Sequence, residues 1–248
     1  MYQFFINSCQ VAEHEVTIIG EDVNHIKNVL RMKPGEEIAA IDHETGTEYR
    51  CEIEDFKEDT VQCKLLFTKE DGIELPSKVY LFQGLPKSDK MELIIQKAVE
   101  LGVYKVIPLA TKRAVVKLDA KKEASKLTRW NLISESAAKQ SKRRIVPEVT
   151  GVMTVKEALA YCRDFDIKLI PYELADKEAM ADTKKIIDNL QPNQSIAIFI
   201  GPEGGFEESE VTTAVDAGFS PITLGRRILR TETAGFTVLS WIMYHLEM

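Results

Sequence analysis

The sequence Ile196-Ala-Ile-Phe-Ile-Gly-Pro-Glu-Gly-Gly-Phe206 joins a wholly apolar run to a glycine-rich turn. A short apolar run bounded by turn residues is typical of a buried strand in a parallel sheet. Glycines let the backbone approach a ligand closely, and ligands of open α/β sheets bind beyond the carboxyl ends of the strands. These residues therefore predict an α/β domain with a ligand site at the end of this strand. A tight strand-to-helix turn without a ligand fits the same residues.

The surrounding pattern supports this fold class. From about residue 72 onward, short apolar runs alternate with segments whose apolar residues recur at helical spacing. Such alternation predicts a parallel sheet with helices on both faces. The predicted strands are 78–83, 105–109, 167–172, 195–200 and 221–224, and the predicted helices are 89–101, 122–140, 155–162, 175–190, 207–217 and 232–245.

The first 70 residues follow a different pattern. Apolar and polar residues alternate there in short runs, which is typical of half-buried strands, and the whole resembles a small β-barrel. A polar stretch at 69–72 predicts a linker, so the expected domains are 1–71 and 72–248. The predicted strands are 2–6, 16–19, 37–41, 49–53 and 60–67, with one short helix over 21–31.

Composition excludes several classes of protein. A chain of 248 residues that is 44% hydrophobic can bury a sizeable core. Its start lacks a basic and apolar leader and no apolar stretch reaches membrane-spanning length, so we expect a cytoplasmic protein with no membrane partner. The four cysteines and four histidines are scattered, which predicts neither a disulfide framework nor a metal site.

Charge is distributed unevenly along the chain. The net charge is −7, and residues 1–70 hold 7 Lys and Arg against 15 Asp and Glu. Residues 78–144 hold 16 Lys and Arg against 6 Asp and Glu. This basic block favours a nucleic-acid partner, because phosphate binding uses clustered cations. Solvated helix faces explain such a block equally well.

A second unusual stretch, Leu224-Gly-Arg-Arg-Ile-Leu-Arg-Thr-Glu-Thr-Ala234, follows the next strand and leads into the last helix. Thr231 is a plausible N-cap for that helix. A capped helix start whose arginines pair with nearby carboxylates would account for this stretch alone. Two glycine-bearing loops at the ends of successive strands nevertheless favour a binding site.

The ligand of these loops is not predicted to be a phosphate. Neither the Walker spacing nor G-x-G-x-x-G is present, and Glu203, Glu207 and Glu208 would repel an anion. A neutral or cationic ligand, such as a sulfonium, suits the loops better. This argues against a dehydrogenase or phosphotransferase.

With both loops in view, the chain resembles the ribosomal RNA small subunit methyltransferase E family, N3-uridine methyltransferases of the knotted SPOUT superfamily. The resemblance covers the full length and is most specific at 201–206 and 224–234. Further matches are residues 85–87, 91–102, Arg113, Trp130 and 135–147. It implies a C-terminal trefoil knot, a PUA-like N-terminal domain, S-adenosylmethionine as cofactor, and a homodimer with the active site at its interface. The implied partner is small-subunit (16S) ribosomal RNA in an assembled 30S particle.

The resemblance also implies which residues bind the cofactor, and the charge distribution adds candidates for RNA binding. The cofactor-binding set is Pro171, Ile200, Gly201, Glu203, Gly205, Leu224, Gly225, Ile228, Leu229, Arg230, Thr233 and Ala234. Arg31, which we also expect to contact RNA, lies in the segment that resembles the family's PUA-like domain. Because that domain is acidic here, we expect most phosphate contacts in the basic block, from Lys87, Lys90, Arg113, Arg143 and Arg144.

The expected chemistry assigns catalytic roles to two residues. Uracil N3 carries a proton that must leave before the ring attacks a methyl group, so negative charge on the flanking carbonyl oxygens needs stabilisation. Arg230 is the candidate for that task, because a guanidinium stays cationic and presents several donors. Glu232 either accepts the proton or orients Arg230, and a structural ion pair is the alternative role for Arg230. Because duplex RNA hides its base edges, the target uridine is expected to be unpaired or flipped.

Two other functions remain open on the sequence. One is a knotted methyltransferase that acts on another RNA, since residues around a cofactor discriminate poorly between substrates. The other is a non-enzymatic RNA-binding assembly factor, which the basic block alone would fit. The polar cluster at 230–233, beside both loops, favours catalysis.

Overall fold

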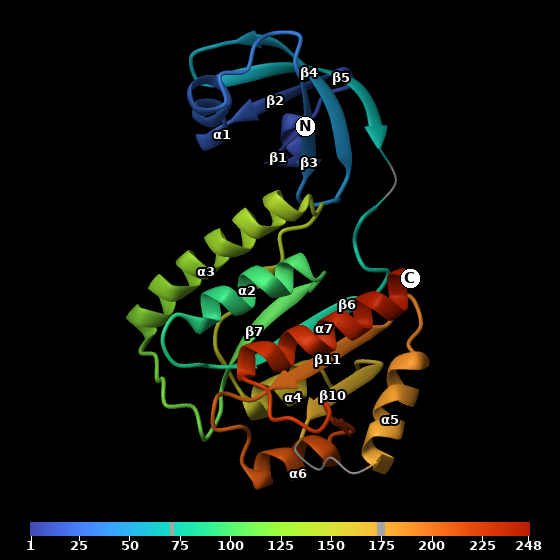
Figure 1. The fold of residues 1–248 in the computed structure, drawn as a ribbon. Helices are drawn as coiled ribbons and strands as arrows, with labels where there is room; N and C mark the ends of the chain where they lie inside the picture. Colours follow the sequence, from blue (N-terminus) through green and yellow to red (C-terminus); the bar gives the residue numbers. More distant parts are fainter. Residues whose placement is uncertain (70–71, 173–176) are drawn as a thin grey trace. The chain divides into compact units, whose positions relative to one another are not determined.

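The computed structural model describes residues 1–69, 72–172 and 177–248, which form two compact units (Figure 1). Unit 1 comprises Met1–Glu74 and Ala138–Val146, and unit 2 comprises Leu75–Ala137 and Pro147–Met248. Segment 138–146, which the sequence assigns to the C-terminal domain, thus clusters with the N-terminal residues. Residues 70–71, at the predicted domain boundary, and 175–176, at the start of a predicted helix, lie outside the described residues.

Unit 1 is built on a curled five-stranded sheet. Strands β1 and β3 pair in parallel and the other neighbours are antiparallel, in the order β1-β3-β4-β5-β2. Alternate residues of the strands, such as Val16 and Ile18 or Ile38 and Ala40, point into a fully buried core. The strands are β1 Tyr2–Ile6, β2 Glu15–Ile19, β3 Glu37–Asp42, β4 Glu48–Phe56 and β5 Thr60–Lys69.

The helical part of unit 1 is shorter than predicted. Instead of one helix over 21–31, α1 Glu21–Asn24 continues into a π-helical turn, His25–Val29, and a short 3-10 turn lies at Ser8–Gln10. Arg31 has a φ of 53°, in the left-handed region, so the chain has left the helix before this residue.

Unit 2 contains the predicted parallel sheet. Its strands pair in the order β12-β10-β11-β6-β7-β8, with β9 also pairing with β7, and every pairing is parallel. Central strands β6 and β11 are almost wholly buried, which explains their continuous apolar sequence. The strands are β6 Lys78–Gly84, β7 Lys105–Ala110, β8 Glu148–Val149, β9 Met153–Thr154, β10 Ile167–Pro171, β11 Ser195–Ile200 and β12 Ser220–Ile222.

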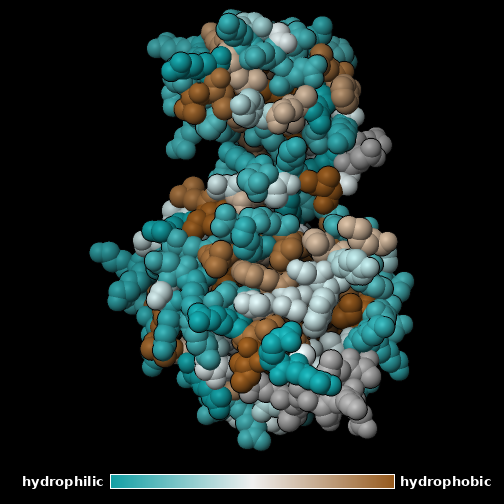
Figure 2. Space-filling model, in the orientation of Figure 1, coloured by the Kyte–Doolittle hydropathy of each residue, from teal (hydrophilic) through white to brown (hydrophobic). Residues whose placement is uncertain are grey.

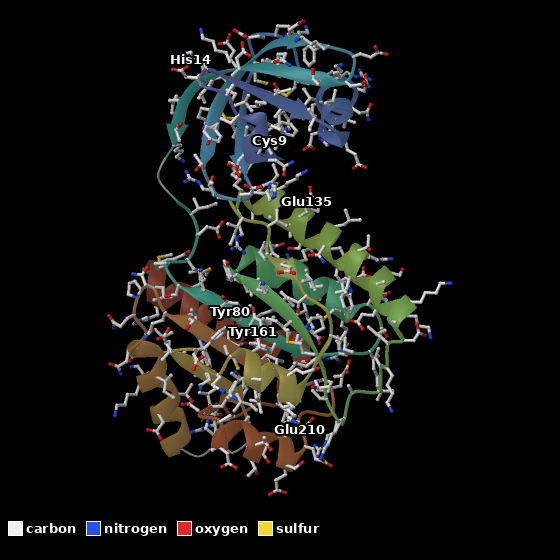
Figure 3. The ribbon with its side chains drawn as sticks, turned by 180° about the vertical axis from the view of Figure 1, so that it is seen from behind. Cys9, His14, Tyr80, Glu135, Tyr161 and Glu210 are labelled. Carbon is white, nitrogen blue, oxygen red and sulfur yellow. The ribbon has the colours of Figure 1, made fainter. Side chains whose placement is uncertain are left out.

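Helices cover both faces of this sheet (Figure 1). Phe82 and Phe199 pack with residues of α4 and α6 on one face, where the view from behind places Tyr161 next to Tyr80 (Figure 3), their ring centroids 6.2 Å apart. On the other face α2 contacts α7, and Leu81 and Ile200 lie under Gly235 of α7. The helices are α2 Lys90–Glu100, α3 Ala120–Ser141, α4 Val155–Tyr161, α5 Lys177–Asp188, α6 Glu208–Asp216 and α7 Thr231–Glu247.

The surface of each unit is mostly hydrophilic on the face shown in Figure 2, with hydrophobic residues in small separate groups. Within the described ranges, no helix is long and apolar enough to cross a membrane. The same residues contain no cluster of His, Cys, Asp and Glu able to hold a metal ion.

Candidate active site

Loops at 85–89, 111–119, 201–207 and 223–230 leave the carboxyl edge of the parallel sheet. Strands β6, β7 and β11 are neighbours with the same direction, so the loops at 85–89, 111–119 and 201–207 begin side by side. The loop at 223–230 follows β12, which is parallel to β10 on the same sheet. Both glycine-bearing loops of the sequence therefore begin at the edge where α/β sheets bind ligands.

The loop at 201–207 is packed too tightly for side chains at its glycines. A Cβ atom on Gly201 would lie 2.9 Å from Cα of Gly205, and one on Gly84 would lie 2.6 Å from the backbone nitrogen of Pro202. Gly205 has a φ of 66°, and its N–H donates to Pro202 O at 2.8 Å. These glycines allow the ends of β6 and β11 to approach each other and fix the course of the loop.

Thr231 links this loop to the last helix. Its hydroxyl donates to Gly201 O at 2.6 Å and accepts from Nε2 of Gln83 at 2.9 Å, and both Thr231 and Gln83 are buried. The prediction that Thr231 caps α7 is wrong, because Arg230 occupies the N-cap position and the Thr231 hydroxyl is used between the loops. The buried hydrogen bonds join β6, the 201–207 loop and the start of α7.

Charged side chains gather beside this link. Nζ of Lys90 lies 3.0 Å from Oε1 of Glu203 and 3.5 Å from Oε2 of Glu232. The backbone N–H of Lys87 also donates to Glu203, at 3.1 Å to Oε1 and 3.3 Å to Oε2. The start of α2 is therefore tied to the 201–207 loop.

The two ionised groups stabilise each other. Burial of Glu203 favours its neutral form, but hydrogen bonds from its own backbone, Lys90 and the Lys87 N–H outweigh this and hold its pKa below the usual value. The hydrogen bond to Glu203 in turn raises the pKa of Lys90. Both groups are charged at neutral pH.

Arg230 is exposed at the start of α7. Within the part of the chain that the structure describes, its guanidinium has no hydrogen-bond or ion-pair partner, and the partner of Glu232 is Lys90. Neither a structural ion pair of Arg230 nor its orientation by Glu232 is thus observed. The neighbouring Arg226 and Arg227 are exposed too.

The loop at 111–119 follows β7 at the same edge of the sheet. The Arg113 guanidinium donates to Gly204 O at 3.0 Å, and Glu210, labelled on α6 in Figure 3, accepts from the Lys112 N–H at 2.9 Å. Glu210 is buried, and its second oxygen accepts from the N–H of Glu207, the N-cap of α6. This loop is thereby attached to the glycine-rich turn.

Comparison with known proteins identifies the family of this arrangement. Residues 73–243 match the family described as an RNA methyltransferase domain, and residues 18–66 match an RNA methyltransferase PUA domain. The Bacillus subtilis ribosomal RNA small subunit methyltransferase E is 40% identical over 100% of this chain and 98% of that protein. The chain belongs to the ribosomal RNA small subunit methyltransferase E family. The Mesomycoplasma hyopneumoniae member is 34% identical over 97% of this chain and 98% of its own length.

A solved member of the methyltransferase E family has the same fold over its whole length. The Neisseria gonorrhoeae enzyme, whose crystal structure is bound to S-adenosyl methionine, matches with a TM-score of 0.83 and 30% identity. The match covers 98% of this chain and 97% of that one. The family's fold, with its PUA and RNA methyltransferase domains, is therefore shown for this protein.

The cofactor-binding residues predicted from the methyltransferase E resemblance lie at the ends of three strands. Pro171 ends β10 and Ile200 ends β11, whereas Leu224 and Gly225 follow β12. Gly225 has a φ of 101°, which favours glycine. Others of the set, Ile228, Leu229, Thr233 and Ala234, lie between this loop and the first turn of α7; Ile228 is 84% exposed, whereas Ala234 is buried.

A cavity of about 370 Å³ borders the second loop. Leu224 and Gly225 line it together with Ile187 of α5 and with Trp241 and Tyr244 of α7. It therefore adjoins two predicted cofactor residues but does not contact the 201–205 turn.

The predicted RNA-binding residues differ in their exposure and in the unit to which they belong. Lys87 and Arg113 lie in loops at the carboxyl edge of unit 2, and Arg31 is exposed in unit 1. Arg143 and Arg144 are only 4% and 6% exposed, and they pair with Glu74 and Glu48 inside unit 1. Their burial in ion pairs argues against the direct phosphate contacts that the basic block had led us to expect of these two arginines.

Sequence reasoning missed Gln83 as a site residue. Its side chain is fully buried at the end of β6 and donates to Thr231 and to Gly84 O. A glutamine that ends an otherwise apolar strand and precedes glycine was the available signal, because buried amides need partners.

Proposed function

We propose that this protein transfers a methyl group from S-adenosylmethionine to N3 of a uridine in small-subunit (16S) ribosomal RNA. Full-length likeness to the B. subtilis methyltransferase supports the substrate class, and the S-adenosyl methionine in the N. gonorrhoeae structure supports the cofactor. The observation that carries the proposal is the exposed guanidinium of Arg230, which has no partner among the described residues and lies two residues from Glu232 at the junction of both glycine loops.

The residues present fit such a cofactor. Backbone and apolar groups at the ends of β10, β11 and β12 would hold the adenosyl part, because adenine binds to apolar walls with a few polar contacts. The carboxylates of Glu203 and Glu232 beside these loops suit a cationic ligand better than a phosphate. When bound, the sulfonium supplies an activated methyl group with a good leaving group, so accurate positioning provides much of the acceleration.

The protein's own task is then to make uracil N3 nucleophilic. Removal of the N3 proton leaves negative charge on the flanking carbonyl oxygens. The guanidinium of Arg230, which is exposed and unpaired within the described ranges, donates hydrogen bonds to them in this proposal. Glu232 is the proton acceptor in this proposal. Its Oε2 lies 3.5 Å from Nζ of Lys90, which places the carboxylate at the start of α7.

The RNA is bound by exposed cations at the same edge. Lys87, Arg113, Arg226 and Arg227 are exposed there, and Arg31 contributes from unit 1. The proposal further includes the trefoil knot and the homodimer with its active site at the interface, both as in the SPOUT superfamily. An assembled 30S particle in the cytoplasm is the proposed substrate.

The test uses purified protein, radiolabelled S-adenosylmethionine and small ribosomal subunits lacking the modification. After digestion of the RNA, mass spectrometry identifies the labelled nucleoside. We expect N3-methyluridine, and we expect Arg230→Ala to lose about 100- to 1000-fold in turnover because a donor to the developing oxyanion is removed. Arg163→Ala, an exposed arginine after α4, is the matched control and keeps its activity.

Each alternative has its own outcome. Label in another nucleoside, or only with another RNA, would replace the substrate and keep the chemistry. Cofactor binding in a calorimeter without methylation of any RNA would contradict the N3-uridine assignment. A wild-type protein that binds RNA but no S-adenosylmethionine would identify a non-enzymatic assembly factor.

A further inference from the structure

Lys90 occupies a position that a simple RNA contact does not explain. It is the first residue of α2, and its ammonium group reaches two carboxylates from distant segments of the chain. Nζ lies 3.0 Å from Oε1 of Glu203, in the glycine-rich turn, and 3.5 Å from Oε2 of Glu232, in the first turn of α7. The side chains of Lys90 and Glu203 are each 29% exposed and that of Glu232 is 15% exposed.

The backbone reinforces this arrangement. Glu203 accepts from the Lys87 N–H with both carboxylate oxygens, so its side chain is fixed against the segment that precedes α2. Two adjacent carboxylates would repel each other across the loops without a cation between them. Lys90 supplies that cation, and its raised pKa agrees with an ammonium group held between carboxylates.

We propose that Lys90 is a positioning residue for methyl transfer, which bridges Glu203 and Glu232 and sets the spacing of the two loops that form the cofactor site. The inference rests on the proposed function for the role of Glu232. It replaces the expectation that Lys90 binds an RNA phosphate, because its ammonium group is already engaged within the protein.

The two roles differ in what they predict for RNA binding. A lysine that contacts a phosphate contributes about one unit to the slope of log affinity against log salt concentration. A lysine that positions carboxylates contributes nothing to that slope, but its loss displaces catalytic groups. Displacement of reacting groups by about 1 Å can lower turnover by about 100-fold.

The experiment compares full-length Lys90→Gln with three other variants. Lys97→Gln removes one charge from the same helix and serves as the neutral control, because its ammonium group pairs with Glu100, three residues away. Lys87→Gln shows how the loss of a phosphate contact changes the salt slope, since this side chain is exposed. Lys90→Arg keeps the charge between the carboxylates. Thermal unfolding of each variant is recorded to compare folding.

We expect Lys90→Gln to lower kcat about 10- to 100-fold and to weaken S-adenosylmethionine binding in the calorimeter, with an unchanged salt slope for ribosomal RNA. Lys90→Arg should recover most of the lost kcat. Glu203→Gln added to Lys90→Gln should cause little further loss, because residues that act through each other are not additive. A salt slope reduced by about one unit in Lys90→Gln, with unchanged kcat and cofactor affinity, would overturn the proposal.

Measurements on wild-type protein test the proposed function independently of the role of Lys90. If wild-type protein binds S-adenosylmethionine but labels no uridine N3, the N3 assignment fails. The S-adenosylmethionine affinities of Lys90→Gln, Glu203→Gln and the double variant then still test whether Lys90 and Glu203 act through each other. Additive losses of affinity in that cycle would refute it.

Discussion

Replacing Thr231 with valine tests whether the buried hydroxyl holds the 201–207 loop to the last helix. Valine has nearly the same shape, so the change removes one oxygen and leaves the packing. Gly201 O then loses its donor at 2.6 Å, and Nε2 of Gln83 loses its acceptor at 2.9 Å. Among the described residues, Gln83 then keeps one side-chain bond, to Gly84 O at 3.0 Å, and its Oε1 already has no partner there.

The expected cost follows from these two lost bonds. A typical intramolecular hydrogen bond contributes about 1 kcal/mol, and a buried group left without a partner costs about 1–3 kcal/mol. Gly201 is only half-buried, so its carbonyl can be partly rehydrated, whereas Gln83 is fully buried. We expect Thr231→Val to lower the free energy of unfolding of unit 2 by about 2–4 kcal/mol. The affinity for S-adenosylmethionine should fall as well, because the loop is no longer fixed.

Equilibrium urea unfolding measures this cost. The fluorescence of Trp130 and Trp241 reports on unit 2, which contains both residues. Thr231→Ser, which keeps the hydroxyl and loses a methyl group, is the matched control and should cost about 1 kcal/mol. A Thr231→Val protein within about 0.5 kcal/mol of wild type, or one more stable than Thr231→Ser, would show that the hydroxyl does not hold the loop.

Three further predictions rest on other contacts. Burial raises the thiol pKa to about 12 for Cys51 and Cys63 and to about 11 for Cys162, whereas Cys9 is exposed. A thiol reagent at pH 8 should therefore label one cysteine in native protein and four after denaturation. Fast labelling of a second cysteine in native protein would contradict the packing. Gly84→Ala places a Cβ 2.6 Å from the Pro202 nitrogen and should destabilise unit 2 by about 1–3 kcal/mol in urea, more than Gly72→Ala, where the nearest atom is 4.0 Å away. The lowered pKa of Glu203 means that its ionised form stabilises the fold above its ordinary value of 4.5, and that this contribution is lost as the pH falls through the folded-state pKa. Thermal melts from about pH 6 to pH 3 should therefore show a weaker acid destabilisation in Glu203→Gln than in wild type, and equal curves would refute the assignment.

Elements with a strong periodic signal were predictable from sequence. The buried strands β6 and β11 and the helix α2 agree with the predictions within one residue at each end, because a continuous apolar run and a helical stripe each have a clear length and boundary. The two-residue strands β8 and β9 were missed, since two residues show no period. The helix predicted over 21–31 was too long because nothing in the local sequence marks the left-handed backbone of Arg31.

The loops of the site were predictable, but the partners of their charged groups were not. Glycine spacing indicated the turns at 201–205 and at 225. A run of cations such as 142–144 does not reveal that Arg143 pairs with Glu74, which lies 69 positions away. Likewise, a threonine before a helix predicts an N-cap equally well whether its hydroxyl caps the helix or, as for Thr231, bonds to another loop.

The division of unit 1 between two stretches of sequence affects how the protein is made and how it can evolve. During synthesis residues 1–74 leave the ribosome first, but Glu74 meets the Arg144 N–H only after another 70 residues have followed. Until then its carboxylate lacks its partners, so unit 1 cannot complete its folding before the first segment of unit 2, Leu75–Ala137, has been translated. For the same reason, an exchange of N-terminal domains between relatives must carry residues 138–146 together with residues 1–74. Recombination at a single point would separate the arginines from the carboxylates that they neutralise.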